Sequence, residues 1–148
     1  MIFMTSRIIT NIMLIFFMLS NVLGQDEVKW TFNYDNQSNK VFFKAELKQY
    51  WHLYSQFIDE DLGPIPTTFE FSENEYVRRV GAVKENNVQT VYDENFGGSL
   101  DIIEGKAVFS QEVILEGPTT LKGSVLFMLC DHNGCLPPDV VEFEIEMN

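Results

Sequence analysis

Cys130 and Cys135 are the two cysteines of this 148-residue chain, and only four residues separate them. In the chain-entropy model, a disulfide across so short a loop stabilises the folded state by only about 2 kcal/mol. Disulfides that hold small secreted domains together usually close longer loops or come in several pairs. A single tight disulfide in a surface turn is more typical of a labile bond that takes part in exchange. The spacing therefore favours thiol–disulfide exchange over a structural clip, and both interpretations stay open.

The residues beside the cysteines influence which sulfur becomes a thiolate, the form that attacks a disulfide. Asp131 and the acidic character of the chain disfavour a thiolate at Cys130, whereas His132 favours it when protonated. The sequence thus indicates a disulfide that a more reactive partner attacks and that then passes electrons onward. Asn133-Gly134 supplies the positive-φ conformations that a tight chain reversal between the cysteines needs.

Metal binding is the main alternative chemistry for two cysteines and two histidines. Structural zinc sites usually hold paired ligands a few residues apart, whereas His52 and His132 lie far apart in the chain. A copper site of the sandwich type would use His, Cys and a weak Met, but Met128 precedes Cys130 instead of following it. We therefore expect no metal and no cofactor. The sequence also contains no Ser-His-Asp arrangement, phosphate-binding loop or paired-carboxylate motif that would indicate a hydrolase.

Short β-strands are the elements that must position the cysteines. Apolar and polar residues alternate with the period of two that is typical of half-buried strands, and no later segment shows a helical period. Turn-forming residues separate the alternating runs, notably in 35–39, 63–66 and 93–98. Seven to nine short strands in one domain predict an all-β, two-sheet sandwich. The expected strands cover residues 30–34, 41–47, 51–56, 67–71, 76–83, 88–92, 107–115, 121–130 and 141–147.

Residues 1–24 have the features of a secretory signal peptide. Arg7 precedes an unbroken apolar run over residues 12–19, and modest side chains precede an expected cleavage after Gly24. The run is shorter than the ~20 residues that cross a bilayer, although an uncleaved membrane anchor is the alternative. Export would place the remaining domain, residues 25–148, in a compartment where a disulfide persists.

The chain is strongly acidic. Its 10 basic and 22 acidic residues give a formal net charge of −12 at pH 7. The expected signal contains one of the basic residues and none of the acidic ones, which leaves 9 basic against 22 acidic residues, a net of −13. Such a surface argues against nucleic acid and anionic membranes as partners. No further apolar run has membrane length, so we expect no membrane insertion after signal removal.

Five sequence segments, which span nearly all of residues 28–147, carry a resemblance to a known family. They are Trp30-Thr31-Phe32, Trp51-His52-Leu53-Tyr54-Ser55, Gly63-Pro64-Ile65-Pro66-Thr67, Phe96-Gly97 and Cys130-Asp131-His132-Asn133-Gly134-Cys135-Leu136-Pro137-Pro138. The last segment is the most specific of the five. On these segments the chain resembles the N-terminal periplasmic domain of the thiol:disulfide interchange protein DsbD, a domain that also occurs alone.

The resemblance implies an immunoglobulin-like β-sandwich in the periplasm, with an extracellular location as the alternative. Its two cysteines would cycle between dithiol and disulfide without a cofactor, as in a protein-disulfide reductase relay. Cys135 would form the mixed disulfides with partner proteins, and Cys130 would resolve them.

The resemblance also implies a cap loop that covers the cysteine pair between encounters. Phe96 matches the aromatic residue over the sulfurs, and Asp93 and Glu94 fall in the acidic stretch before it. Tyr54 matches an aromatic residue near the cysteines. His52 stands where some family members have tyrosine.

Partners of such a domain would be thioredoxin-like domains or disulfide isomerases, reached through mixed disulfides. The chain contains neither the multi-helix membrane domain nor the thioredoxin-like domain of the full transporter, so we expect a separate protein, such as a membrane thiol transporter, to reduce it. The alternative function is a non-catalytic immunoglobulin-like interaction domain in which the disulfide clips one turn.

Overall fold

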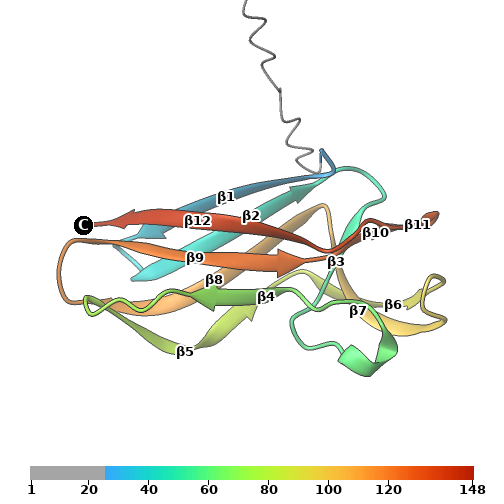
Figure 1. Ribbon diagram of the computed structural model, residues 1–148, viewed down its shortest axis with the longest axis horizontal. Helices are drawn as coiled ribbons and strands as arrows, with labels where there is room; N and C mark the ends of the chain where they lie inside the picture. The colour runs from blue at the N-terminus through green and yellow to red at the C-terminus, as the bar shows by residue number, and fades with distance from the viewer. Residues whose placement is uncertain (1–25) are drawn as a thin grey trace, which may run out of the picture.

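The computed structural model describes residues 26–148, which form an all-β domain (Figure 1). The expected signal peptide, residues 1–24, lies outside the described residues. Within residues 26–148 no helix has the length and apolar character needed to span a membrane. The elements are β1 (Val28–Asp35), β2 (Lys40–Leu47), β3 (His52–Tyr54), the 3-10 turn η1 (Glu60–Leu62), β4 (Thr68–Phe71), β5 (Val77–Glu85), β6 (Val88–Asp93), β7 (Gly98–Glu104), β8 (Lys106–Leu115), β9 (Thr119–Phe127), β10 (Leu129–Asp131), β11 (Gly134–Cys135) and β12 (Asp139–Met147).

Two antiparallel sheets face one another across the main core. One has the strand order β1-β2-β8-β5 and the other the order β12-β9-β4. Phe43 of β2 and Phe143 of β12 meet between them with ring centroids 5.0 Å apart. Both rings are almost completely buried, because alternate residues of each strand point inward as the period of two predicts. The expected all-β sandwich is confirmed.

A third sheet, of order β11-β10-β3-β7-β6, extends one end of the sandwich (Figure 1). The chain enters it directly from the core, because β9 ends at Phe127 and β10 begins at Leu129. The sequence predicts one continuous strand here. Phe127 and Leu129 are both buried, so the alternation of apolar residues continues while the strand changes its hydrogen-bonding partners.

Strand β7 is absent from the sequence-based expectation, although it lies between β3 and β6 in the third sheet. It aligns Ile102 with Tyr54 and Ile103 with Leu53. Ile102 and Ile103 are both buried, on opposite faces of the strand. Two consecutive buried residues interrupt the alternation, which is why the pattern does not reveal this strand.

Candidate functional site

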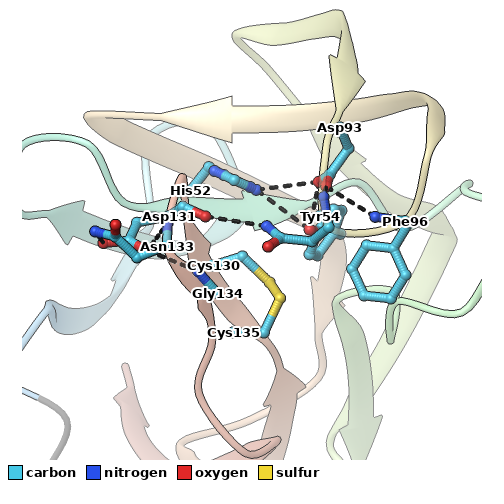
Figure 2. The surroundings of a disulfide bond; sticks show 10 residues. His52, Tyr54, Asp93, Phe96, Cys130, Asp131, Asn133, Gly134 and Cys135 are labelled. Atoms are coloured by element: carbon cyan, nitrogen blue, oxygen red, sulfur yellow. Dashed lines mark hydrogen bonds and ion pairs between the residues drawn. A yellow bond between two sulfur atoms is a disulfide. The ribbon is translucent and has the colours of Figure 1, made fainter.

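The two cysteines lie opposite one another on neighbouring strands at the end of the sandwich. Cys130 of β10 pairs with Cys135 of β11 in antiparallel register, their Cα atoms are 4.0 Å apart, and a disulfide joins them (Figure 2). Cys130 is completely buried, whereas Cys135 is partly exposed. The two cysteines are therefore unequally exposed, and Cys135 is the residue nearer to solvent.

The turn between the cysteines is organised by Asp131. Its Oδ1 accepts hydrogen bonds from the backbone N–H groups of Asn133 (2.7 Å) and Gly134 (3.1 Å). The bond from Asn133 holds the pKa of the exposed Asp131 carboxyl below its ordinary value. Gly134 has φ +152°, a conformation that side chains disfavour, so glycine is required where the chain reverses into β11. The Asn-Gly turn that the sequence indicates is thus a compact hairpin.

A buried hydrogen bond links the strand beside the cysteines to the next hairpin. The Tyr54 hydroxyl of β3 donates to Asp93 Oδ2 at the end of β6, over 2.6 Å. Tyr54 is completely buried and Asp93 is 4% exposed. Burial, together with the hydrogen bond to Asp93, raises the pKa of Tyr54 far above its ordinary value. The phenol therefore stays a neutral donor, and the Asp93 carboxylate stays in place.

The loop after Asp93 is closed on itself. Asp93 Oδ1 accepts the backbone N–H groups of Asn95 (2.8 Å) and Phe96 (3.3 Å), and the Asp93 carbonyl accepts the N–H of Gly97 (2.8 Å). The φ of Gly97, +68°, completes the turn into β7. One more bond reaches outward, from Asn95 Nδ2 to the backbone oxygen of Asp131 (3.0 Å). We call residues 93–97 the cap loop.

Phe96 is the residue that the sequence predicts as a cover for the disulfide. Its ring packs edge-on to Tyr54 with centroids 5.9 Å apart (Figure 2). The segment that contains Gly63 also lies against the Phe96 ring. A Cβ added at Gly63 would be 2.8 Å from Phe96 Cδ1, so only glycine leaves room for the ring. Phe96 and Cys135 both pack against one small buried cluster, which consists of Tyr54, Leu100, Ile102 and Cys130.

His52 belongs to the same network. It lies opposite Cys130 in the pairing of β3 with β10, and it is 8% exposed. Its Nε2 is 3.2 Å from the Tyr54 hydroxyl oxygen and 3.5 Å from Asp93 Oδ2. Burial lowers the pKa of His52 below its ordinary value, although the Asp93 carboxylate opposes this shift. The imidazole is therefore neutral at neutral pH.

Glu94 and His132 lie at the rim of a groove of about 350 Å³ beside this network. Both are exposed, and His132 packs edge-on to Tyr50 with ring centroids 6.2 Å apart. Within residues 26–148, no three His, Cys, Asp or Glu side chains are grouped so that they could hold a metal ion. The structure thus brings His52, Tyr54, Asp93 and Phe96 together at the disulfide, with Glu94 and His132 further out.

Sequence reasoning missed two residues of the site, Asn95 and Gly63. Asn95 joins the cap loop to the cysteine strand, and its place between Asp93 and Phe96 is the only signal for it. Gly63 lies against the Phe96 ring. The sequence shows it as a turn residue and as part of one segment of the resemblance, with nothing that links it to Phe96. A search for turn residues within the cap loop could have found Asn95 but not Gly63.

Fold and site together define an immunoglobulin-like β-sandwich that carries one disulfide at its end. The family model for "Thiol:disulfide interchange protein DsbD, N-terminal" matches residues 20–146. The chain belongs to the DsbD N-terminal family, which confirms the resemblance seen in the sequence. A cysteine pair at disulfide distance in this family fits a thiol–disulfide interchange domain.

Solved structures with the same fold include two from Neisseria meningitidis. The reduced DsbD N-terminal domain has a TM-score of 0.61 and 15% identity, and the match covers 82% of this chain and 86% of that one. The complex between the DsbD N-terminal and the PilB N-terminal domains gives 0.61 and 11%, with coverage of 84% and 87%.

A third similar structure is the N-terminal periplasmic domain of ScsB from Proteus mirabilis. Its TM-score is 0.53 and its identity 14%, over 81% of this chain and 44% of that one. At such identities these likenesses show the fold alone. No curated protein matches the sequence of the chain.

Proposed function

We propose that this domain is an exported thiol–disulfide interchange relay. It would take reducing equivalents from a thioredoxin-like donor through Cys130 and Cys135 and pass them to oxidised thiol proteins outside the cytoplasm. The observation that carries the proposal is the unequal disulfide, in which one cysteine is buried and the other is partly exposed, beside residues 93–97. A clip that only stabilised a turn would need neither the inequality nor the cap.

In the reductive half of the relay, a thiolate of the donor attacks Cys135 Sγ. The bond between Cys130 and Cys135 breaks, a mixed disulfide forms at Cys135, and Cys130 leaves as a thiolate that takes up a proton. The donor's second thiolate then attacks its own sulfur in the mixed disulfide. Cys135 is released and protonated, and the donor becomes a disulfide, so two electrons and two protons have moved.

In the oxidative half, the Cys135 thiolate attacks the disulfide of an acceptor protein, and one acceptor thiol leaves. Cys130 then attacks Cys135 Sγ, which re-forms the intramolecular disulfide and releases the acceptor as a dithiol. The completely buried Cys130 is suited to this resolving role, because an incoming protein reaches the partly exposed Cys135 first.

The cap loop fits a cover that partners must displace. Phe96 packs against the same buried cluster as Cys135. In the proposed relay the ring moves aside when a partner thiolate attacks. Small thiols that lack a docking surface would meet the closed form. This would restrict exchange to proteins that bind the end of the sandwich.

Known relatives support the proposed setting and the kind of partner. A DsbD N-terminal domain has been seen in complex with a PilB N-terminal domain, and the ScsB domain is described as periplasmic. We extend both to this chain: a periplasmic domain that docks with a thioredoxin-like protein. A separate membrane thiol transporter is the proposed source of the electrons.

Two measurements test the proposal. In the first, the domain is equilibrated with dithiothreitol and glutathione buffers, and a reduction potential near that of the compartment is expected. In the second, Cys130→Ala is expected to trap Cys135 in mixed disulfides with a thioredoxin-fold protein. Cys135→Ala serves as the matched control and should trap far less, because its remaining sulfur is buried. A potential far below ~−300 mV with no covalent complexes would mark a structural bond and favour the interaction domain instead.

A further inference from the structure

The hydrogen bonds around Tyr54 fix the protonation pattern of His52. A phenol has one proton to donate, and Tyr54 gives it to Asp93 Oδ2 over 2.6 Å. The Tyr54 oxygen can therefore only accept from His52 Nε2, which lies 3.2 Å away. An Nε2 lone pair would instead face two oxygen atoms, the phenol oxygen and Asp93 Oδ2 at 3.5 Å. Neutral His52 must then carry its hydrogen on Nε2.

The cap loop is built as one unit with few fastenings to the body of the domain. Asp93 Oδ1 and the Asp93 carbonyl bind the loop's own N–H groups, so these bonds stay within the loop. The fastenings to the body are Asp93 Oδ2 with Tyr54, the bond from Asn95 to Asp131, and the packing of Phe96. Asp93 thus connects the loop to strand β3. Interactions that fix the position of Asp93 Oδ2 therefore also fix the position of the loop.

We propose that His52 is a positioning residue that keeps the cap loop closed over the disulfide by donating its Nε2–H to Tyr54 and Asp93. The donated hydrogen lies between the two oxygens and offsets the charge of a carboxylate that is almost fully buried. The proposal rests on the proposed function, because a closed cap matters for a disulfide that partners attack. The role is indirect, because His52 Nε2 interacts with Tyr54 and Asp93 and not with a sulfur atom.

The rate at which a small phosphine reduces the disulfide measures how accessible the disulfide is. The phosphine attacks one sulfur, the disulfide breaks, water supplies the oxygen of the phosphine oxide, and two thiols result. The rate is divided by the rate for a small linear disulfide at the same pH, which cancels the reagent's own titration. This ratio reports access to the disulfide whatever its reduction potential, so it stays informative even where the proposed relay fails its own test.

The variants are His52→Leu, which removes the donor, and His52→Gln, whose amide N–H can replace Nε2–H. We expect the normalised rate of His52→Leu to be about tenfold above wild type, because a hydrogen bond to a charged acceptor is lost. His52→Gln should return the rate to near the wild-type value. Circular dichroism and urea unfolding establish that each variant is folded.

Nitrogen-15 NMR of the wild-type protein gives a second readout that needs no variant. It should find the Nε2–H tautomer of His52 at neutral pH. The Nδ1–H tautomer would overturn the proposal, and so would a wild-type rate in a folded His52→Leu protein. A Gln variant as fast as the Leu variant would also overturn it, since the donor would then be irrelevant.

Discussion

Replacing Gly63 by alanine tests whether Phe96 covers the disulfide. A Cβ at this position would lie 2.8 Å from Phe96 Cδ1 and 3.0 Å from Cε1, far closer than the ~3.5–4.0 Å at which carbon atoms attract. The Phe96 ring is at the tip of a hairpin, whereas Gly63 follows η1 on another segment. The ring is therefore the group that we expect to move, and under the proposed role of Phe96 its displacement would uncover the disulfide.

Two costs contribute to the effect of Gly63→Ala. Residue 63 has φ +112°, and holding alanine there costs about 1–3 kcal/mol. Displacing the half-buried Phe96 ring loses part of its packing, about 1 kcal/mol when half of a buried side chain's transfer energy is counted. We expect the free energy of unfolding to fall by about 2–4 kcal/mol. The population with an open cap should rise about fivefold, which is the factor that ~1 kcal/mol represents.

Urea unfolding measures the stability, and phosphine reduction without denaturant measures the access. Gly105→Ala is the matched control, because Gly105 also has a positive φ, +68°, and an added Cβ meets no atom within 4 Å. This control should lose stability through strain alone and keep the wild-type rate of reduction. Equal normalised rates for Gly63→Ala and Gly105→Ala would refute the reasoning that Phe96 shields the disulfide.

Three further predictions concern stability. Tyr54→Phe removes the donor to the buried Asp93 and should lower the free energy of unfolding in urea by about 1.5–3 kcal/mol. The control Tyr92→Phe, at an exposed position, should change this free energy by less than about 0.5 kcal/mol. Similar losses in both variants would contradict the buried hydrogen bond. Replacing both cysteines by alanine should cost about 2 kcal/mol in the same assay, and a loss more than twice as large would show that the disulfide holds the fold. Because burial lowers the pKa of His52, the unfolded chain binds its proton more readily, so stability should fall as pH drops from about 7 to 5 and should fall less in His52→Gln. Identical pH profiles of wild type and variant would exclude His52 as the cause.

The fold class was readable in the sequence wherever one face of a strand meets one core. In β2, the buried residues Val41, Phe43 and Ala45 alternate with exposed or half-buried neighbours, and the period of two reports this directly. The pattern failed where a strand is buried on both faces, as at Ile102 and Ile103, because no alternation exists there. It also could not show that the chain changes sheets before β10, since periodicity describes side-chain direction and not hydrogen-bonding partners.

Parts of the site were predictable for a different reason. The two cysteines are close in sequence, so their spacing alone suggested a disulfide in a tight turn. The contact between Phe96 and Gly63 was not predictable, because it joins two segments that only the packed fold brings together. The same holds for His52, whose partners Tyr54 and Asp93 depend on the arrangement of three neighbouring strands.

The pairing of β10 with β11 has a consequence for the kinetics of any mixed disulfide. The register that sets Cys130 opposite Cys135 is also held by the Asp131 turn and by the bond from Leu136 N–H to the Leu129 carbonyl, 2.9 Å. None of these contacts involves the sulfur atoms, so the hairpin keeps the two side chains adjacent after the disulfide is broken. Well-oriented groups held in this way can react as if at an effective concentration of ~10⁵ M. A covalent complex at Cys135 should therefore be short-lived, because the neighbouring sulfur competes with every other thiol in the surroundings.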